Sequence, residues 1–196
     1  KQGVLDDTAI IISADHGENL GELNVYGDHQ TADYITGRVP LIIRWPGKDK
    51  GTVVDGMCYN VDLAATVTEL CGQQCPDTWD GQSFSHVLDG MDWEGRETVV
   101  VSQGAWACQR GVRFGPWMLI RTWHDGLKDF PEVLLFNIEE DPHETNNLAA
   151  ECPDVVNEGV DRLLKWKDQM MKTMPYGATT DPLDVILQEG GPFHAN

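Results

Sequence analysis

A continuous β-branched run near the start of the chain most constrains its fold. Residues 8–13 read TAIIIS, with apolar side chains at consecutive positions rather than at every second one. A strand of this kind is covered on both faces, as parallel strands inside α/β sheets are. We therefore expect a buried, parallel-type strand, and it leads directly into Asp15-His16-Gly17-Glu18. In open α/β sheets, ligands bind in the crevice beyond the ends of such strands.

The pattern of elements changes near residue 95. Before it, the sequence predicts a second strand over 39–44, a helix over 61–71 and a short helix over 83–88, which together are typical of part of an α/β sheet. After it, the sequence predicts a long helix and four strands joined by short turns. The helix spans 153–171, and the strands span 98–102, 110–114, 117–123 and 133–138. We expect two domains, an α/β portion over 1–94 and an α+β subdomain with a tail over 95–196.

The charge of the chain excludes some classes of partner. Its 196 residues carry 14 Lys and Arg against 32 Asp and Glu, a formal net charge of −18. Nucleic-acid binders hold phosphates with an excess of basic residues, so we expect no nucleic acid as a partner. No stretch approaches the roughly 20 apolar residues of a membrane span. An anionic substrate would need a bound cation to reverse the field locally.

Asp15 and His16 are the sharpest candidates for chemistry. Just past a strand, adjacent side chains can converge on one ion, and Gly17 permits the turn that this requires. The two residues alone leave two interpretations open: a divalent-metal site, or a solvated turn with a hydrogen-bonded histidine.

Five blocks of sequence, in order along the chain, resemble the sulfatase family of the alkaline phosphatase superfamily. They are SADHGENLGE at 13–22, TGRVPLIIRWPG at 36–47, NVDLAAT at 60–66, GQSF at 81–84 and LFNIEEDPHETNNL at 135–148. The resemblance implies an α/β fold, namely the C-terminal part of an alkaline-phosphatase-like sandwiched sheet. A smaller α+β subdomain with a four-stranded antiparallel sheet and a long helix would follow it.

The same resemblance implies a sulfuric-ester hydrolase. In this family a formylglycine, made from the first residue of a C/S-x-P-x-R motif, is the nucleophile, and a divalent cation binds it together with a sulfate oxygen. No C/S-x-P-x-R motif occurs in the 196 residues, and the two early Asp ligands of the family are absent as well. We therefore expect the chain to be the C-terminal part of a sulfatase, partnered by the N-terminal part of the same enzyme and inactive alone.

The resemblance also assigns roles to single residues. Asp15 and His16 match the late pair of metal ligands; the metal is usually Ca²⁺, although the pair alone also admits Mn²⁺ or Zn²⁺. His29 lies in the stretch where many sulfatases place a group that contacts the sulfate or the leaving oxygen. His124 and Arg113 are candidates for binding the organic part of the substrate, and His194 is a weaker candidate near the end of the chain.

Three functions remain open at this level. The first is a sulfatase acting on a sulfated small molecule or glycan. The second is a phosphodiesterase or phosphonate monoester hydrolase of the same superfamily, since both reactions rely on charge stabilisation by cations. The third is a non-catalytic binding fragment. The sequence does not specify the compartment, and it leaves a homo-oligomer open.

Overall fold

The computed structural model describes residues 2–48, 51–174 and 179–192. The chain separates into two compact units, one made of Lys1–Ala14 and Pro40–Val99, the other of Asp15–Val39 and Val100–Asn196. The last crossing of the chain between the two units, after residue 99, lies near the expected change of pattern at 95. The stretch 15–39, however, packs with the C-terminal half. The predicted domain boundary between residues 94 and 95 stays a prediction, because the division of a chain into compact units does not by itself establish domain boundaries.

Among its described residues, the first unit contains one strand pair and three helical segments. Strand β1 (Ile10–Ser13) pairs antiparallel with β4 (Leu41–Arg44), and Ile11 lies opposite Ile43. The helical segments are η1 (Leu5–Asp7), α2 (Asn60–Leu70) and η3 (Ser85–Asp89). Asp62, at the start of α2, is fully buried and accepts hydrogen bonds from Arg96 Nε at 2.8 Å and Gln82 N at 2.7 Å.

The prediction of a buried parallel strand at residues 8–13 was wrong in two respects. The strand runs over Ile10–Ser13 and its partner β4 is antiparallel. Within the described residues it is also exposed, since Ile12 retains 52% of its accessible surface. A continuous apolar run indicates that a strand prefers two covered faces, but it does not encode the direction of the neighbouring strand.

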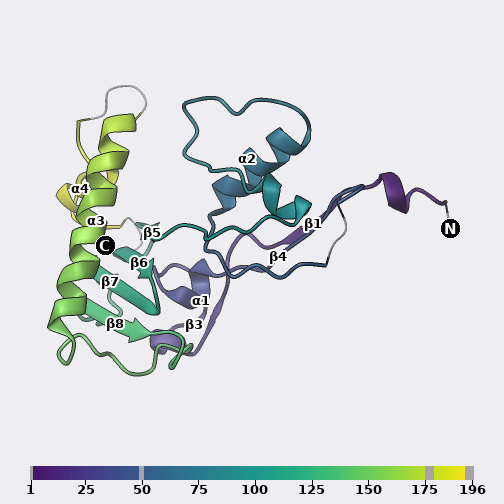
Figure 1. Ribbon diagram of the computed structural model, residues 1–196. Coiled ribbons are helices and arrows are strands. Elements are labelled where there is room, and N and C mark those ends of the chain that lie inside the picture. The colour runs from purple at the N-terminus through teal and green to yellow at the C-terminus, as the bar shows by residue number, and fades with distance from the viewer. Residues whose placement is uncertain (1, 49–50, 175–178, 193–196) are drawn as a thin grey trace. The chain divides into compact units, whose positions relative to one another are not determined.

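The second unit is built on a four-stranded antiparallel sheet, as predicted (Figure 1). Its strands lie in the order β5-β6-β7-β8, and they span Val99–Gln103, Cys108–Phe114, Trp117–His124 and Val133–Asn137. The predicted long helix is α3 (Pro153–Thr173), which lies across one face of this sheet; a short helix, α4 (Pro182–Gln188), follows.

Alternation along the strands gives this sheet two apolar faces. Leu119, Leu135 and Val112 point to the face covered by α3 and pack with Leu163 and other side chains of that helix. The opposite face carries Met118, Ile120, Leu134 and Phe136, which cluster around Ala32. Residues 15–39 therefore cover the second face. They contain β2 (Asn19–Leu20), η2 (Glu22–Asn24), β3 (Tyr26–Asp28) and α1 (Tyr34–Gly37).

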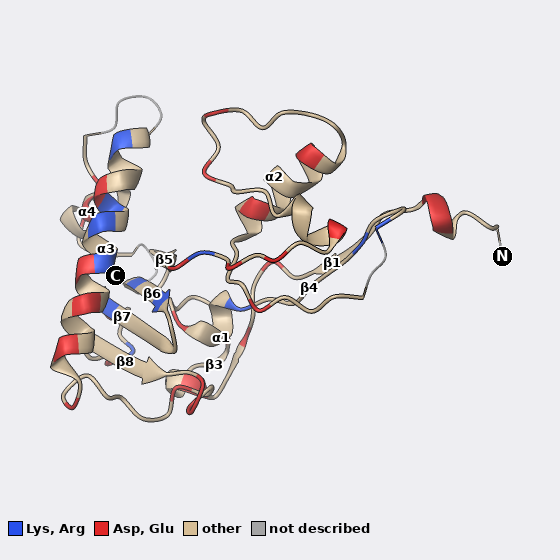
Figure 2. Ribbon diagram, viewed as in Figure 1, with Lys and Arg blue, Asp and Glu red and all other residues tan. Residues whose placement is uncertain are grey.

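The charges of α3 follow its helix dipole. Asp154 lies in its first turn and Lys172 in its last, and Figure 2 shows acidic residues gathered toward the beginning of the helix and basic residues toward its end. This arrangement places each sign where the partial charge of the helix end is opposite. Among the described residues, no helix combines the length and apolar character needed to cross a membrane.

Candidate active site

Gly17 holds the loop after β1 against helix α1. Its backbone N–H donates to the carbonyl of Thr36 at 2.9 Å. A Cβ atom at this position would lie 1.9 Å from the carbonyl oxygen of Ile35, so no other residue fits without moving the backbone. The close approach, rather than an unusual turn conformation, explains why this loop carries glycine between His16 and Glu18.

A buried polar network joins the same loop to the segment that follows β3. Asn19 is fully buried, and its Nδ2 donates to Thr31 Oγ1 at 2.9 Å and to Asp33 Oδ2 at 3.1 Å. Asp33, also fully buried, caps α1 by accepting from Thr36 N at 2.8 Å. Removing one partner of a buried hydrogen bond destabilises the folded protein, so these contacts resist separation. The network therefore fixes the relative position of residues 15–19 and 29–33.

Glu144 attaches this segment to the loop after β8. Its two carboxyl oxygens accept from the backbone N–H of Tyr34, the first residue of α1, at 3.1 and 3.2 Å. Burial, together with the nearby Asp33 carboxylate, raises the pKa of Glu144 to about 8. The protonated form is therefore favoured in the folded protein near neutral pH.

His16 presents one specific ring nitrogen to Asp15. Its Nδ1 lies 2.7 Å from the carbonyl oxygen of Gly17, which can only accept, so Nδ1 carries the proton. In the neutral imidazole Nε2 then keeps its lone pair, and it lies 3.8 Å from Asp15 Oδ2. Asp15 is 89% exposed, and a hydrogen bond from its own backbone N–H together with the field of His16 lowers the pKa of its carboxyl. Two ligand atoms of the types that metals bind therefore lie side by side.

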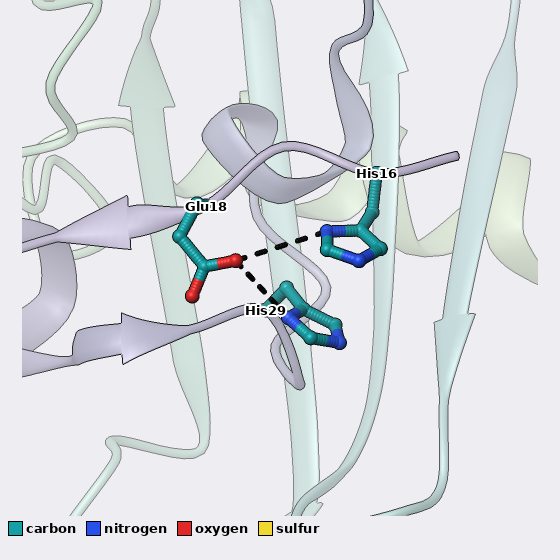
Figure 3. Close-up of side chains that lie close together, drawn as sticks. All are labelled: His16, Glu18 and His29. Carbon is teal, nitrogen blue, oxygen red and sulfur yellow. Dashed lines mark hydrogen bonds and ion pairs between the residues drawn. The ribbon is translucent and has the colours of Figure 1, made fainter. Parts of the chain in front are cut away.

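His29 lies against His16, from which it is separated by 13 positions in the sequence. The two imidazole rings are stacked, with centroids 3.6 Å apart and planes 15° from parallel. Glu18 lies beside both rings (Figure 3), with its Oε2 3.2 Å from His29 Nδ1 and 3.8 Å from His16 Nδ1. The structure thus brings together three of the residues singled out in the sequence, Asp15, His16 and His29, whose roles stay predictions.

His124 lies at the end of the β6–β7 hairpin that faces the segment after His29. It pairs with Cys108, and the neighbouring Gln109 accepts from the backbone N–H of Ala32 at 3.1 Å. Gly126 N donates to His124 Nδ1 at 3.1 Å, so this nitrogen is unprotonated and Nε2 carries the proton. Gly191 lies against the ring, where a Cβ would approach to 2.5 Å. His194 lies outside the described residues.

Arg113 lies near the opposite end of the same hairpin. It pairs with Met118, six residues before His124 along β7, which corresponds to roughly 20 Å of extended strand. Its Nη1 is buried and has no hydrogen-bond partner among the described residues, and burial lowers the pKa of its guanidinium. The structure does not bring Arg113 and His124 together, and the role predicted for each of them in binding the organic part of the substrate stays a prediction.

Three residues of this region received no role from the sequence. Glu18 belongs to the same block as Asp15 and His16, so its proximity in sequence was an available signal. Asn19 and Asp33 carried none, because neither their burial nor their mutual contact can be read from residues 14 positions apart.

Comparison with known proteins relates the chain to one family. Residues 33–169 match the family model described as N-sulphoglucosamine sulphohydrolase, C-terminal. The choline-sulfatase of Rhizobium meliloti is 32% identical over 74% of the chain, and the multifunctional alkaline phosphatase superfamily protein PehA of Trinickia caryophylli is 27% identical over 91%.

A solved structure shows the same relationship in three dimensions. It contains a protein in complex with its substrate, D-glucosamine-2-N,6-O-disulfate, and it superposes on 91% of the chain with a TM-score of 0.74 and 26% identity. The chain covers 28% of the choline-sulfatase, 39% of PehA and 37% of that structure. It therefore spans roughly a third of the length of these proteins.

Proposed function

Since the chain belongs to the family of C-terminal N-sulphoglucosamine sulphohydrolase domains, we propose that it functions as part of a metal-dependent sulfuric-ester hydrolase. The observation that carries this proposal is the pairing of Asp15 Oδ2 with the free Nε2 of His16, 3.8 Å apart, within a chain whose relatives are sulfatases. Fold similarity alone would not suffice, because one fold supports many reactions.

The residues present fit a divalent metal ion. A histidine that binds a metal usually donates its other ring N–H to a carbonyl or carboxylate, and His16 does this through Nδ1 to Gly17. Asp15 and His16 would hold the ion, with Ca²⁺ as the expected metal and Mn²⁺ or Zn²⁺ as alternatives. When bound, such an ion would neutralise charge on a sulfate and lower the pKa of a nucleophile.

The charges around the site also call for a cation. Asp15 and Glu18 lie on the loop that carries His16, and Asp28, the last residue of β3, directly precedes His29. Three carboxylates in this region of a chain with a net charge of −18 would repel a sulfate ester. A divalent ion at Asp15 and His16 would reverse the local field and allow an anionic substrate to approach.

We assign His29 to a contact with the sulfate or the leaving oxygen. Its imidazole stacks on His16, so a substrate held at the metal would lie within reach of His29. The nucleophile would be a formylglycine supplied by polypeptide outside these 196 residues, which contain no C/S-x-P-x-R motif. The substrate would be a sulfated sugar or small molecule, as the names of the choline-sulfatase and of the glucosamine disulfate complex suggest.

Calorimetric titration of the full-length protein with Ca²⁺ tests the metal site. We expect Asp15→Ala and His16→Ala each to weaken binding by at least tenfold, because each removes a direct ligand. Asp161→Ala, on the exposed face of α3, and His143→Ala, at a side chain that is 69% exposed, are matched controls and should bind as the wild type does. Unchanged affinity in the first two variants would remove both residues from the site.

Paired assays separate the two catalytic candidates. The second candidate is a phosphonate monoester or phosphodiester hydrolase of the same superfamily, because the relative PehA is named as a multifunctional protein of that superfamily. For a sulfatase we expect kcat/KM for 4-nitrophenyl sulfate to exceed that for the matching phosphate diester and phenylphosphonate. The reverse order would assign the chain to the second candidate.

A further inference from the structure

The carboxylate of Glu18 lies between two histidines that reach it from different loops (Figure 3). Its Oε2 is 3.2 Å from Nδ1 of His29, within hydrogen-bond distance, and 3.8 Å from Nδ1 of His16, outside it. His16 Nδ1 already donates to Gly17. The carboxylate is therefore engaged by His29, whose Nδ1 must carry the proton to donate to it.

The three side chains are close enough to suggest a shared metal ion, but the ring geometry opposes one. A nitrogen lone pair lies in the plane of its imidazole, and the two rings are nearly parallel at 15°. An ion midway between rings 3.6 Å apart would lie about 1.8 Å out of both planes. His16 Nδ1 is also protonated and cannot bind it. The contact between Glu18 and His29 is thus a hydrogen bond within the protein.

The fold fixes both ends of this contact. Glu18 is flanked by Gly17, whose backbone packs closely against α1 and donates to the carbonyl of Thr36 at 2.9 Å, and by the fully buried Asn19. On the other loop, the backbone N–H of His29 donates to Asp28 Oδ1 at 2.7 Å. Asn19 ties the two loops together through Thr31. The backbone segments that carry Glu18 and His29 are therefore both held in place, which fixes the positions from which the two side chains make contact.

We propose that Glu18 is a positioning residue for His29. By accepting a hydrogen bond from Nδ1–H, the Glu18 carboxylate selects the imidazole tautomer in which Nδ1 is protonated, and it directs Nε2 away from the loop, toward substrate. A carboxylate that orients a histidine in this way sets both its ring rotation and the nitrogen available for chemistry. This inference rests on the role of His29 proposed above, whereas the tautomer itself can be measured independently of any activity.

The full-length protein carrying Glu18→Leu, Glu18→Gln or His29→Gln tests the proposal, together with the double variant Glu18→Leu/His29→Gln. The Glu18 side chain is 40% exposed, so leucine is tolerated sterically, and thermal melts check folding. His143, which contacts Glu22 at 2.9 Å, offers a matched carboxylate–histidine pair away from the site; His143→Gln is the control. Two readouts are used: kcat and KM with an aryl sulfate, and the His29 tautomer from ¹⁵N chemical shifts of labelled imidazoles.

We expect Glu18→Leu to lower kcat about ten- to hundredfold with little change in KM, and Glu18→Gln, whose amide oxygen can still accept, to recover most of it. In the His29→Gln background, Glu18→Leu should lower kcat by less than about twofold, because Glu18 acts through His29. The Nδ1-protonated tautomer of His29 should dominate in the wild type and in the control and be lost in Glu18→Leu.

Two results would overturn the positioning role. One is an unchanged His29 tautomer in Glu18→Leu; the other is an equal loss of kcat whether or not His29 is present, which would indicate a structural role only. If the wild type hydrolyses neither sulfate nor phosphate esters, the proposed function fails, while the tautomer measurement still decides the contact.

Discussion

At the scale of single residues, Gly17 is the position where the site loop tolerates no side chain. Alanine would place its Cβ 1.9 Å from a backbone oxygen of α1, and backbone cannot rotate aside as a side chain can. We expect Gly17→Ala to lower the free energy of unfolding by about 1–3 kcal/mol or more. Urea denaturation measures the loss.

Gly27 provides the contrast for this substitution. It has a positive φ of 64°, but no atom lies within 4 Å of the position that an alanine methyl group would take. Gly27→Ala therefore meets only backbone strain, which costs about 1 kcal/mol. If Gly17→Ala proved no more destabilising than Gly27→Ala, the loop would have to be freer than the structure indicates.

Glu144 predicts a pH dependence of stability. Burial and Asp33 raise its pKa to about 8 from an ordinary value of 4.5. Below about pH 4.5, the folded and unfolded states both hold the proton. Between about 4.5 and 8 the unfolded state has lost it and the folded state has not, so stability falls as the pH rises through this window. Above 8 the contribution is constant.

Glu144→Gln removes this titration while its amide oxygen can still accept from Tyr34. The free energy of unfolding of the wild type relative to Glu144→Gln should therefore decrease by a few kcal/mol between pH 4.5 and 8. Denaturation across this range measures the difference, with Glu140→Gln at an exposed position as the control. A difference that stays constant with pH would show that Glu144 is ionised in the folded protein.

At the scale of elements, a buried ion pair attaches α4 to the sheet. Arg110 on β6 donates to both oxygens of Asp181, at 2.6 and 2.5 Å, and both side chains are almost fully buried. Burial alone would raise the pKa of Asp181, but hydrogen bonds from Arg110, the backbone N–H of Leu183 and Lys167, together with the charge of Arg110, outweigh it and bring the pKa to about 2. Asp181 also caps α4 by accepting from Leu183 N.

Asp181→Asn removes the negative charge that faces Arg110 but keeps the helix cap, because the asparagine side-chain oxygen can still accept from the backbone N–H of Leu183. We expect a loss of about 3–5 kcal/mol in the free energy of unfolding, since Arg110 would remain buried without its counter-charge. Asp184→Asn removes a partly exposed partner of Lys167 and should cost less than about 1 kcal/mol. Equal effects of the two substitutions in chemical denaturation would contradict this assignment.

The elements themselves were largely predictable. Four strands and the long helix of the second unit lie within a few residues of their predicted positions, because alternating and helical apolar patterns are local. The direction of β1 was not predictable, since pairing depends on a strand elsewhere in the chain. The covering of the sheet by residues 15–39 was also missed, because it depends on Ala32 meeting a face formed about 100 residues later.

At the scale of the whole molecule, the 196 residues carry two of the proposed metal ligands. We expect the isolated chain to release no 4-nitrophenol from 4-nitrophenyl sulfate and to bind Ca²⁺ more weakly than the full-length protein does. Colorimetric assay and calorimetry of both proteins measure these differences. Sulfatase turnover by the isolated chain would overturn the proposal that its nucleophile lies outside these residues.

The sequence by itself determined the family and the identity of the candidate ligands, because Asp15, His16 and their neighbours form a contiguous block that does not depend on folding to be read. Only the tertiary structure decided which atoms meet. The protonated Nδ1 of His16, the stacking of His29 and the contact with Glu18 all depend on two loops held together by Asn19 and Asp33. Short-range patterns specify elements, whereas hydrogen bonds between distant residues specify a site.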